Sequence, residues 1–187
     1  MDITLFKKKG SIFLKELSSK KDISNEESEG YLITSSEKEI RSIISSLSSK
    51  NIKKPIFVKA NDDLFNRRII ETCKIDYLVS LELNPSKDTL KQRSSGLNHV
   101  LAKEALKKEI NFVINFSEIK KLNKEEKIKA ISRIIQNIKV CRKAKCNIKI
   151  ASFAKSEEEI ISEEELKSFL FSLGASSQQV GQSTNFF

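Results

Sequence analysis

Residues 93–117 read RSSGLNHVLAKEALKKEINFVINFS, and this stretch predicts a loop, a helix and a strand in succession. Asn98 can cap a helix over residues 99–108, because an Asn side chain at that position accepts a hydrogen bond from the first helical turn. Gly96 permits a tight turn or a close approach of the backbone. Residues 110–116 are apolar without clean alternation, which is typical of a strand buried on both faces. A basic loop, a helix start and a strand end therefore fall together, and α/β proteins place their ligands at such points.

The rest of the chain repeats this alternation of short apolar strands and amphipathic helices. Ser36 and Ser162 each begin a capping pattern, because a Glu follows three residues later. Residues 12–17 are expected to form a short amphipathic helix near the start of the chain. The alternation predicts an α/β fold on parallel strands, for which an open doubly wound sheet and a closed or partly closed barrel both fit. Strands are expected over residues 30–34, 55–59, 75–80, 110–116 and 147–151.

The length of 187 residues fits one α/β domain, which we expect over residues 1–175, followed by a loosely ordered tail over residues 176–187. The three cysteines form no Cys-x-x-Cys pair, which favours a reducing, cytoplasmic setting over a disulfide framework. No apolar run approaches the roughly 20 residues of a membrane span, so no membrane partner is expected.

The net charge of +9 favours a polyanionic partner, because Lys and Arg contacts to phosphates release condensed counterions. A Lys-rich surface without a nucleic-acid partner is the alternative. The charge is unevenly spread, since residues 118–145 carry ten Lys or Arg and three Glu. Residues 155–167 carry two Lys and six Glu. This asymmetry suggests one face for RNA and another that is turned away from it or towards a basic partner protein.

Catalytic motifs are scarce in this sequence. A metallohydrolase site normally needs several His with carboxylates, whereas His99 is the one histidine of the chain. The chain also has no Gly-x-x-x-x-Gly-Lys loop and no Gly-x-Gly-x-x-Gly motif. A basic α/β scaffold of this kind favours an RNA-binding subunit over an independent enzyme. A degenerate barrel phosphoesterase and a protein–protein scaffold with an incidental basic surface remain as alternatives.

The candidate site lies in the loops at the carboxyl ends of parallel strands, where Lys59 and Arg93 fall. The Arg93 guanidinium can hold two phosphate oxygens at once, although it could equally pair with a nearby acid. Gly96 and Asn98 are expected to form the turn that orients this loop, and no catalytic or metal-binding residue is predicted. The candidate RNA-binding residues are Arg93, Lys91, Lys103, Lys107, Lys59, Arg142 and Lys143.

The turn at 93–98, the helix residues 100–103 and the strand end at 114–117 resemble the signature of the ribonuclease P protein component 3 family. This family is the archaeal relative of the eukaryotic thirty-kilodalton ribonuclease P subunit. Weaker matches in the same order extend the resemblance over about residues 30–180. The chain departs from the family pattern in its first strand and in the turn before its late helix, and we expect it to end before the usual final strand.

The resemblance implies a TIM-barrel-like fold of parallel strands, similar to polymerase-and-histidinol-phosphatase domains and here shortened or incompletely closed. It implies a protein subunit of ribonuclease P, a ribonucleoprotein endoribonuclease, which supports the catalytic RNA in removing the 5′ leader from precursor tRNA. The protein alone would then be non-catalytic and bind no cofactor, with Mg²⁺ held by the RNA subunit. The implied partners are the ribonuclease P RNA, protein component 2, other ribonuclease P proteins and, indirectly, precursor tRNA.

Overall fold

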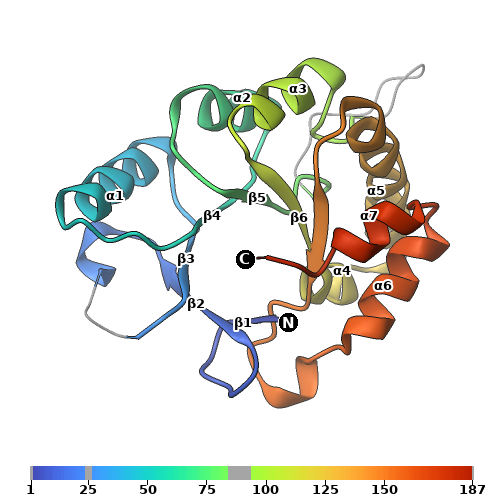
Figure 1. Ribbon diagram of the computed structural model, residues 1–187, viewed down its shortest axis with the longest axis horizontal. Coiled ribbons are helices and arrows are strands. Elements are labelled where there is room, and N and C mark those ends of the chain that lie inside the picture. Colours follow the sequence, from blue (N-terminus) through green and yellow to red (C-terminus); the bar gives the residue numbers. More distant parts are fainter. Residues whose placement is uncertain (1, 24–26, 84–93, 187) are drawn as a thin grey trace.

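The computed structural model describes residues 2–23, 27–83 and 94–186. Within these ranges, seven strands form one sheet in which each strand pairs in parallel with the next along the chain. The sheet curves into a ring, as Figure 1 shows. The strands are β1 (Ile3–Thr4), β2 (Ile12–Leu17), β3 (Gly30–Ile33), β4 (Ile56–Lys59), β5 (Tyr77–Val79), β6 (Asn111–Asn115) and β7 (Ile148–Ala151).

The α-helices lie outside this ring (Figure 1), as expected when a helix connects successive parallel strands. Polar side chains cap most of them; Ser36, Asp62 and Asn123, for example, each accept a hydrogen bond from the backbone three residues later. The described connections also contain two short 3₁₀ turns, Lys20–Asp22 and Glu157–Glu159. The helices are α1 (Glu37–Ser49), α2 (Asp63–Thr72), α3 (His99–Lys107), α4 (Phe116–Lys121), α5 (Lys124–Ala144), α6 (Glu163–Ser172) and α7 (Ser177–Gln182).

The ring has one unsealed seam, between β7 and β1. Among the described residues, one isolated parallel bridge joins the two edges, between Thr4 and Ala154. The Asp2 carboxylate adds a side-chain link, because it accepts hydrogen bonds from the backbone N–H and the hydroxyl of Ser152. The prediction of a shortened, incompletely closed barrel of parallel strands is therefore confirmed, and the open doubly wound sheet is excluded.

Two hydrophobic cores follow from this geometry. One fills the inside of the ring and includes Leu14, Leu32, Phe57 and Val113. The other, larger core lies between the strands and the surrounding helices. Successive residues of a strand point to opposite faces, so a strand covered on both faces is apolar throughout. This explains why all four residues of β3 and three central residues of β6 are buried and apolar.

The C-terminal segment enters the ring from the amino ends of the strands, and Figure 1 places the end of the chain near its centre. Phe186 is 6% exposed and packs against Phe57 and Tyr77. The Tyr77 hydroxyl donates to the Phe186 carbonyl, and the Ile150 N–H donates to the Ser183 carbonyl at 2.9 Å. Residues 176–186 therefore pack against the barrel and are not the loosely ordered tail that the sequence predicted. A single buried aromatic ring, Phe186, anchors this otherwise polar segment.

The region predicted as a helix over residues 12–17 is strand β2, so that prediction is wrong. Ile12, Leu14 and Leu17 are buried there. Leu14 faces the inside of the ring, whereas Leu17 packs in the outer core. Such a short apolar run fits either period, and here pairing with both β1 and β3 decided the outcome.

Candidate nucleic-acid interface

The mouth of the barrel lies at the carboxyl ends of the strands and holds a pocket of about 260 Å³. Lys59 ends β4, Ser80 follows β5, and Glu118 lies in α4 just after β6. The Glu118 carboxylate accepts hydrogen bonds from the Lys59 ammonium and, at 2.6 Å, from the Ser80 hydroxyl. The mouth therefore contains an internally paired charge network.

Two further lysines at the mouth also have acidic partners. Lys121 lies 2.9 Å from Glu159, and Lys155 lies 3.6 Å from Glu16, measured from nitrogen to oxygen. These pairs neutralise much of the positive charge that the sequence places at the strand ends. Lys59 thus lies at the carboxyl end of a strand, as the sequence predicted, but its ammonium forms an ion pair with Glu118.

Glu82 is a residue at the mouth that the sequence did not predict. Its side chain is 2% exposed, and its Oε1 atom has no hydrogen-bond partner among the described residues. Burial is the main cause that raises the pKa of this carboxyl to about 8, and the nearby charge of Glu118 adds to the effect. Glu82 lines a second pocket, of about 270 Å³, with Lys59, Lys129 and Arg133. No sequence signal marks Glu82, since the strong burial arises only after the barrel closes.

The turn before α3 is fixed by backbone geometry and by its contact with α5. Gly96 has φ +75°, and a Cβ atom there would lie 2.5 Å from the Leu81 carbonyl oxygen. Asn98 is the N-cap of α3, with its side chain accepting from the Leu101 N–H at 2.9 Å. Asn137 of α5 donates to the Ser95 carbonyl at 3.0 Å. These contacts hold the start of α3 against the barrel.

The seven candidate residues do not converge on one point. Arg93 and Lys91 lie outside the described residues. Lys103 and Lys107 are both exposed on α3, and the Lys107 ammonium lies 3.3 Å from the Glu104 carboxylate. Lys59 lies in the mouth, separate from that exposed helix surface.

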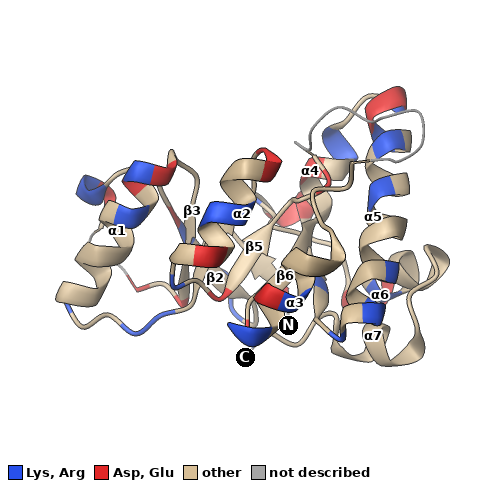
Figure 2. Ribbon diagram, turned by 90° about the horizontal axis from the view of Figure 1, so that it is seen from above, with Lys and Arg blue, Asp and Glu red and all other residues tan. Residues whose placement is uncertain are grey.

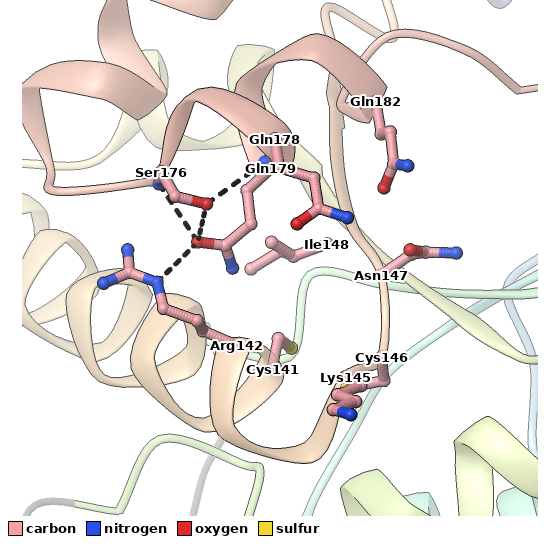
Figure 3. A pocket seen from close by; sticks show the side chains of 10 residues that line it. All are labelled: Cys141, Arg142, Lys145, Cys146, Asn147, Ile148, Ser176, Gln178, Gln179 and Gln182. Carbon is pink, nitrogen blue, oxygen red and sulfur yellow. Dashed lines mark hydrogen bonds between the residues drawn. The ribbon is translucent and has the colours of Figure 1, made fainter.

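Arg142 and Lys143 lie at the end of α5, near the amino end of β7. Arg142 donates to the Gln179 side chain at 3.0 Å and to the Gly174 carbonyl, so it ties α5 to the α6–α7 turn. Figure 3 shows this contact at the edge of a pocket of about 450 Å³. Arg142 therefore has a structural role here, whereas Lys143 is exposed.

The outer face of α5 carries several cations, and the sequence-based candidates include only Lys143 among them. Figure 2 shows Lys and Arg at several points along this helix. Lys129, Lys139 and Lys143 are exposed. Lys139 and Lys143 lie on the side of α5 opposite its buried residues, and Lys129 lies on the flank of the helix, where it also lines the pocket beside Glu82. We call these three residues the α5 lysine stripe. None of them forms an ion pair with another described residue, and α3 packs beside α5. The spacing of four residues between Lys139 and Lys143 could have identified these two from the sequence.

The described part of the chain offers neither a metal centre nor a membrane anchor. Residues 2–23, 27–83 and 94–186 contain no group of three or more His, Cys, Asp or Glu side chains placed to hold a metal ion. Within the same ranges, none of the helices is long and apolar enough to cross a membrane.

Comparisons with known proteins agree with the resemblance in the sequence. The family model of RNase P subunit p30 matches residues 31–185. Ribonuclease P protein component 3 of Methanococcus vannielii is 23% identical over 142 residues, which covers 76% of this chain and 58% of that relative. The present chain thus spans little more than half the length of that protein.

Solved structures show the same barrel. A chain in the cryo-EM structure of archaeal ribonuclease P with mature tRNA matches with a TM-score of 0.72 and 18% identity, over 97% of this chain and 87% of that one. An amidohydrolase matches with a TM-score of 0.57 and 14% identity, over 84% of this chain and 40% of the amidohydrolase. At these identities the structural matches show the fold alone. The family model covers most of the chain, and this protein therefore belongs to the RNase P subunit p30 family, as residues 93–117 predicted.

Proposed function

We propose that this protein is a subunit of ribonuclease P that supports the catalytic RNA in removing the 5′ leader from precursor tRNA. The observation that carries the proposal is the family match over residues 31–185. The barrel shared with a chain of archaeal ribonuclease P supports it at the level of the fold. The partners would be the ribonuclease P RNA, protein component 2 and other ribonuclease P proteins, with precursor tRNA contacted indirectly.

The protein's contribution in this proposal is electrostatic. The α5 lysine stripe and the neighbouring Lys103 and Lys107 of α3 present exposed ammonium groups on adjacent helices. Contacts between such groups and RNA phosphates release condensed counterions and stabilise compact RNA. Arg93 and Lys91 join this surface as a prediction from sequence.

Catalysis itself would belong to the RNA. The family resemblance implies that the RNA subunit holds the Mg²⁺ ions and performs the phosphodiester hydrolysis. The protein would lower the Mg²⁺ concentration that the RNA needs, because protein cations replace part of the ionic screening of the folded RNA. A cytoplasmic location is part of the same proposal and is supported by three buried cysteines that are all free.

The main test removes the charge of the stripe through the triple variant Lys129→Gln, Lys139→Gln and Lys143→Gln. We expect the slope of log affinity against log salt for the ribonuclease P RNA to become shallower by roughly 0.7–0.9 for each phosphate that is no longer neutralised. Reconstituted cleavage of precursor tRNA should then need more Mg²⁺. The measurements are binding titrations at several salt concentrations and cleavage rates across a Mg²⁺ series.

The matched control replaces Lys38, Lys50 and Lys53, three exposed lysines at and beyond α1, on the opposite side of the ring from α5 (Figure 1). The control has the same change of net charge but should keep the salt slope. Equal slopes in the wild-type protein and the stripe variant, or equal reductions in both variants, would contradict the assignment of the α5 face to RNA.

A smaller set of variants tests the other predicted contacts. Lys103→Gln should reduce the salt slope more than Lys107→Gln, because Lys107 has Glu104 beside it. Arg93→Ala should weaken RNA binding and steepen the Mg²⁺ dependence of cleavage. If Arg93→Ala leaves both unchanged at low Mg²⁺, that residue does not contact the RNA.

A further inference from the structure

The end of α5 folds back sharply before β7. The Cys146 N–H donates to the Cys141 carbonyl at 3.1 Å, and the Lys145 N–H donates to the Arg142 carbonyl at 3.4 Å. Lys145 between them has φ +62°, in the left-handed region. This pair of bonds is the Schellman motif, which brings residues five positions apart much closer than a continuing helix would. The turn therefore places Cys141 and Cys146 side by side.

The two thiols interact and differ in acidity. The neighbouring Cys141 thiol is the main cause that lowers the pKa of Cys146. The Cys146 sulfur beside it, together with burial, raises the pKa of Cys141. Cys146 is therefore the more acidic of the two thiols. Thiolate rather than thiol is the nucleophile in exchange with disulfides, so Cys146 would react first.

A pocket of about 450 Å³ gives access to this pair. Cys141 and Cys146 both line it, together with Arg142, Lys145 and several amide side chains (Figure 3). The two cationic side chains favour an anionic reactant at its entrance. Cys146 is 6% exposed and Cys141 is fully buried, which suits attack on Cys146 first and resolution by Cys141 second.

We propose that Cys141 and Cys146 form a reversible dithiol–disulfide pair that is oxidised by a small, carboxylate-bearing disulfide. The Cys146 thiolate attacks one sulfur of the reactant, whose S–S bond breaks and releases one thiolate. Cys141 then gives its proton to the released thiolate, and the Cys141 thiolate attacks the Cys146 sulfur of the mixed disulfide and expels the second thiolate. Two cysteine thiols are oxidised and one disulfide is reduced to two thiols, so the exchange balances. The product links the last turn of α5 to the turn that precedes β7.

Cys73 provides an internal control for this proposal. It is also a free, buried cysteine, but it lies at the end of α2, where its sulfur is 3.9 Å from the hydroxyl of Thr72. Without a second thiol beside it, Cys73 has no resolving partner and should stay reduced. The pair at the α5–β7 corner does not depend on the proposed role in ribonuclease P.

The test incubates the full chain in oxidised and reduced glutathione at defined ratios. Remaining thiols are alkylated and counted by mass spectrometry, and protease digestion maps any linked peptides. We expect two of the three thiols to disappear together, a linked peptide that contains Cys141 and Cys146, and full reversal by reduced glutathione. Circular dichroism confirms that the protein stays folded.

Three variants sharpen the result. Cys73→Ser should keep the transition, whereas Cys146→Ser should abolish it. Cys141→Ser should accumulate a mixed disulfide with glutathione on Cys146, because the resolving thiol is gone. The proposal fails if wild-type protein keeps all three thiols under oxidising ratios, or if Cys73 reacts as readily as the pair. It also fails if the wild-type protein keeps glutathione bound to Cys146 and forms no intramolecular disulfide. These outcomes are measured on the wild-type protein, so they do not depend on whether a variant folds.

Discussion

Lys59, Ser80 and Glu118 form a charged network at the carboxyl end of the barrel, while Phe186 packs against Phe57 and Tyr77 towards the amino end. The amino end gains stability from burial of apolar surface, which depends little on pH. The mouth carries paired charges and a buried carboxyl, Glu82, whose ionisation is unfavourable. The amino end of the barrel is therefore closed by apolar packing that stabilises the fold, whereas the carboxyl end contains polar groups whose burial costs stability.

The contrast also separates the mouth from the outer surface. Lys59, Lys121 and Lys155 have acidic partners at the mouth, whereas the α5 lysine stripe has none among the described residues. In α/β barrels the mouth is the usual place for a ligand site. Here Lys139 and Lys143, which have no acidic partner among the described residues, lie on the outside of α5, a location better suited to an extended polyanion than to a small substrate.

Phe186→Ala should have the largest effect on stability. Removing a buried aromatic ring costs about 3–5 kcal/mol of unfolding free energy, because it removes apolar burial and leaves a cavity. Urea unfolding followed by circular dichroism measures this decrease. The control is Phe171→Ala, since Phe171 is 63% exposed and should change the free energy by no more than about 0.5 kcal/mol. Similar decreases for both variants would show that Phe186 does not anchor the C-terminal segment.

Glu82→Gln should change how stability depends on pH. The folded-state pKa of about 8 lies above the ordinary value of 4.5, so the folded protein binds more protons than the unfolded chain between these values. Stability of the wild-type protein should therefore fall as pH rises through this window, with a slope from Glu82 approaching about 1.4 kcal/mol per pH unit.

The variant lacks this ionisable group, so its stability relative to wild type should increase from pH 5 to pH 8. Unfolding curves of both proteins across that range give the difference directly, because all other titrating groups are shared. A constant difference would mean that Glu82 ionises at its ordinary pKa and that the mouth is more open to water than the structure shows.

The Lys59–Glu118 pair should have the smallest effect. A double-mutant cycle with Lys59→Met and Glu118→Gln should give a coupling energy of about 0.5–1 kcal/mol, because both side chains are partly exposed. The exposed pair Arg67–Glu71 on α2 serves as the comparison and should give about 0.3–0.5 kcal/mol. A coupling no larger than that of the α2 pair would mean that the mouth network adds nothing beyond an ordinary surface contact.

Local signals in the sequence were sufficient to predict most of the helices and strands. Ser36, Asn98 and Ser162 cap helices where the sequence predicted, because a cap depends on residues within one turn. The short helix α4 was not predicted, since it begins at Phe116 directly after β6 with no loop between them. The site was less predictable than the elements, because Lys59 and Arg142 gained partners from distant segments.

The sequence by itself determined the alternation of strands and helices, the positive charge of α5 and the family to which residues 93–117 belong. These features depend on residue type and on spacings of a few positions. Only the tertiary structure decided that residues 12–17 form a strand, that Phe186 enters the ring and that Lys59 pairs with Glu118. Each of these outcomes requires two segments far apart in the chain to meet, and no local pattern encodes which segments meet when the barrel closes.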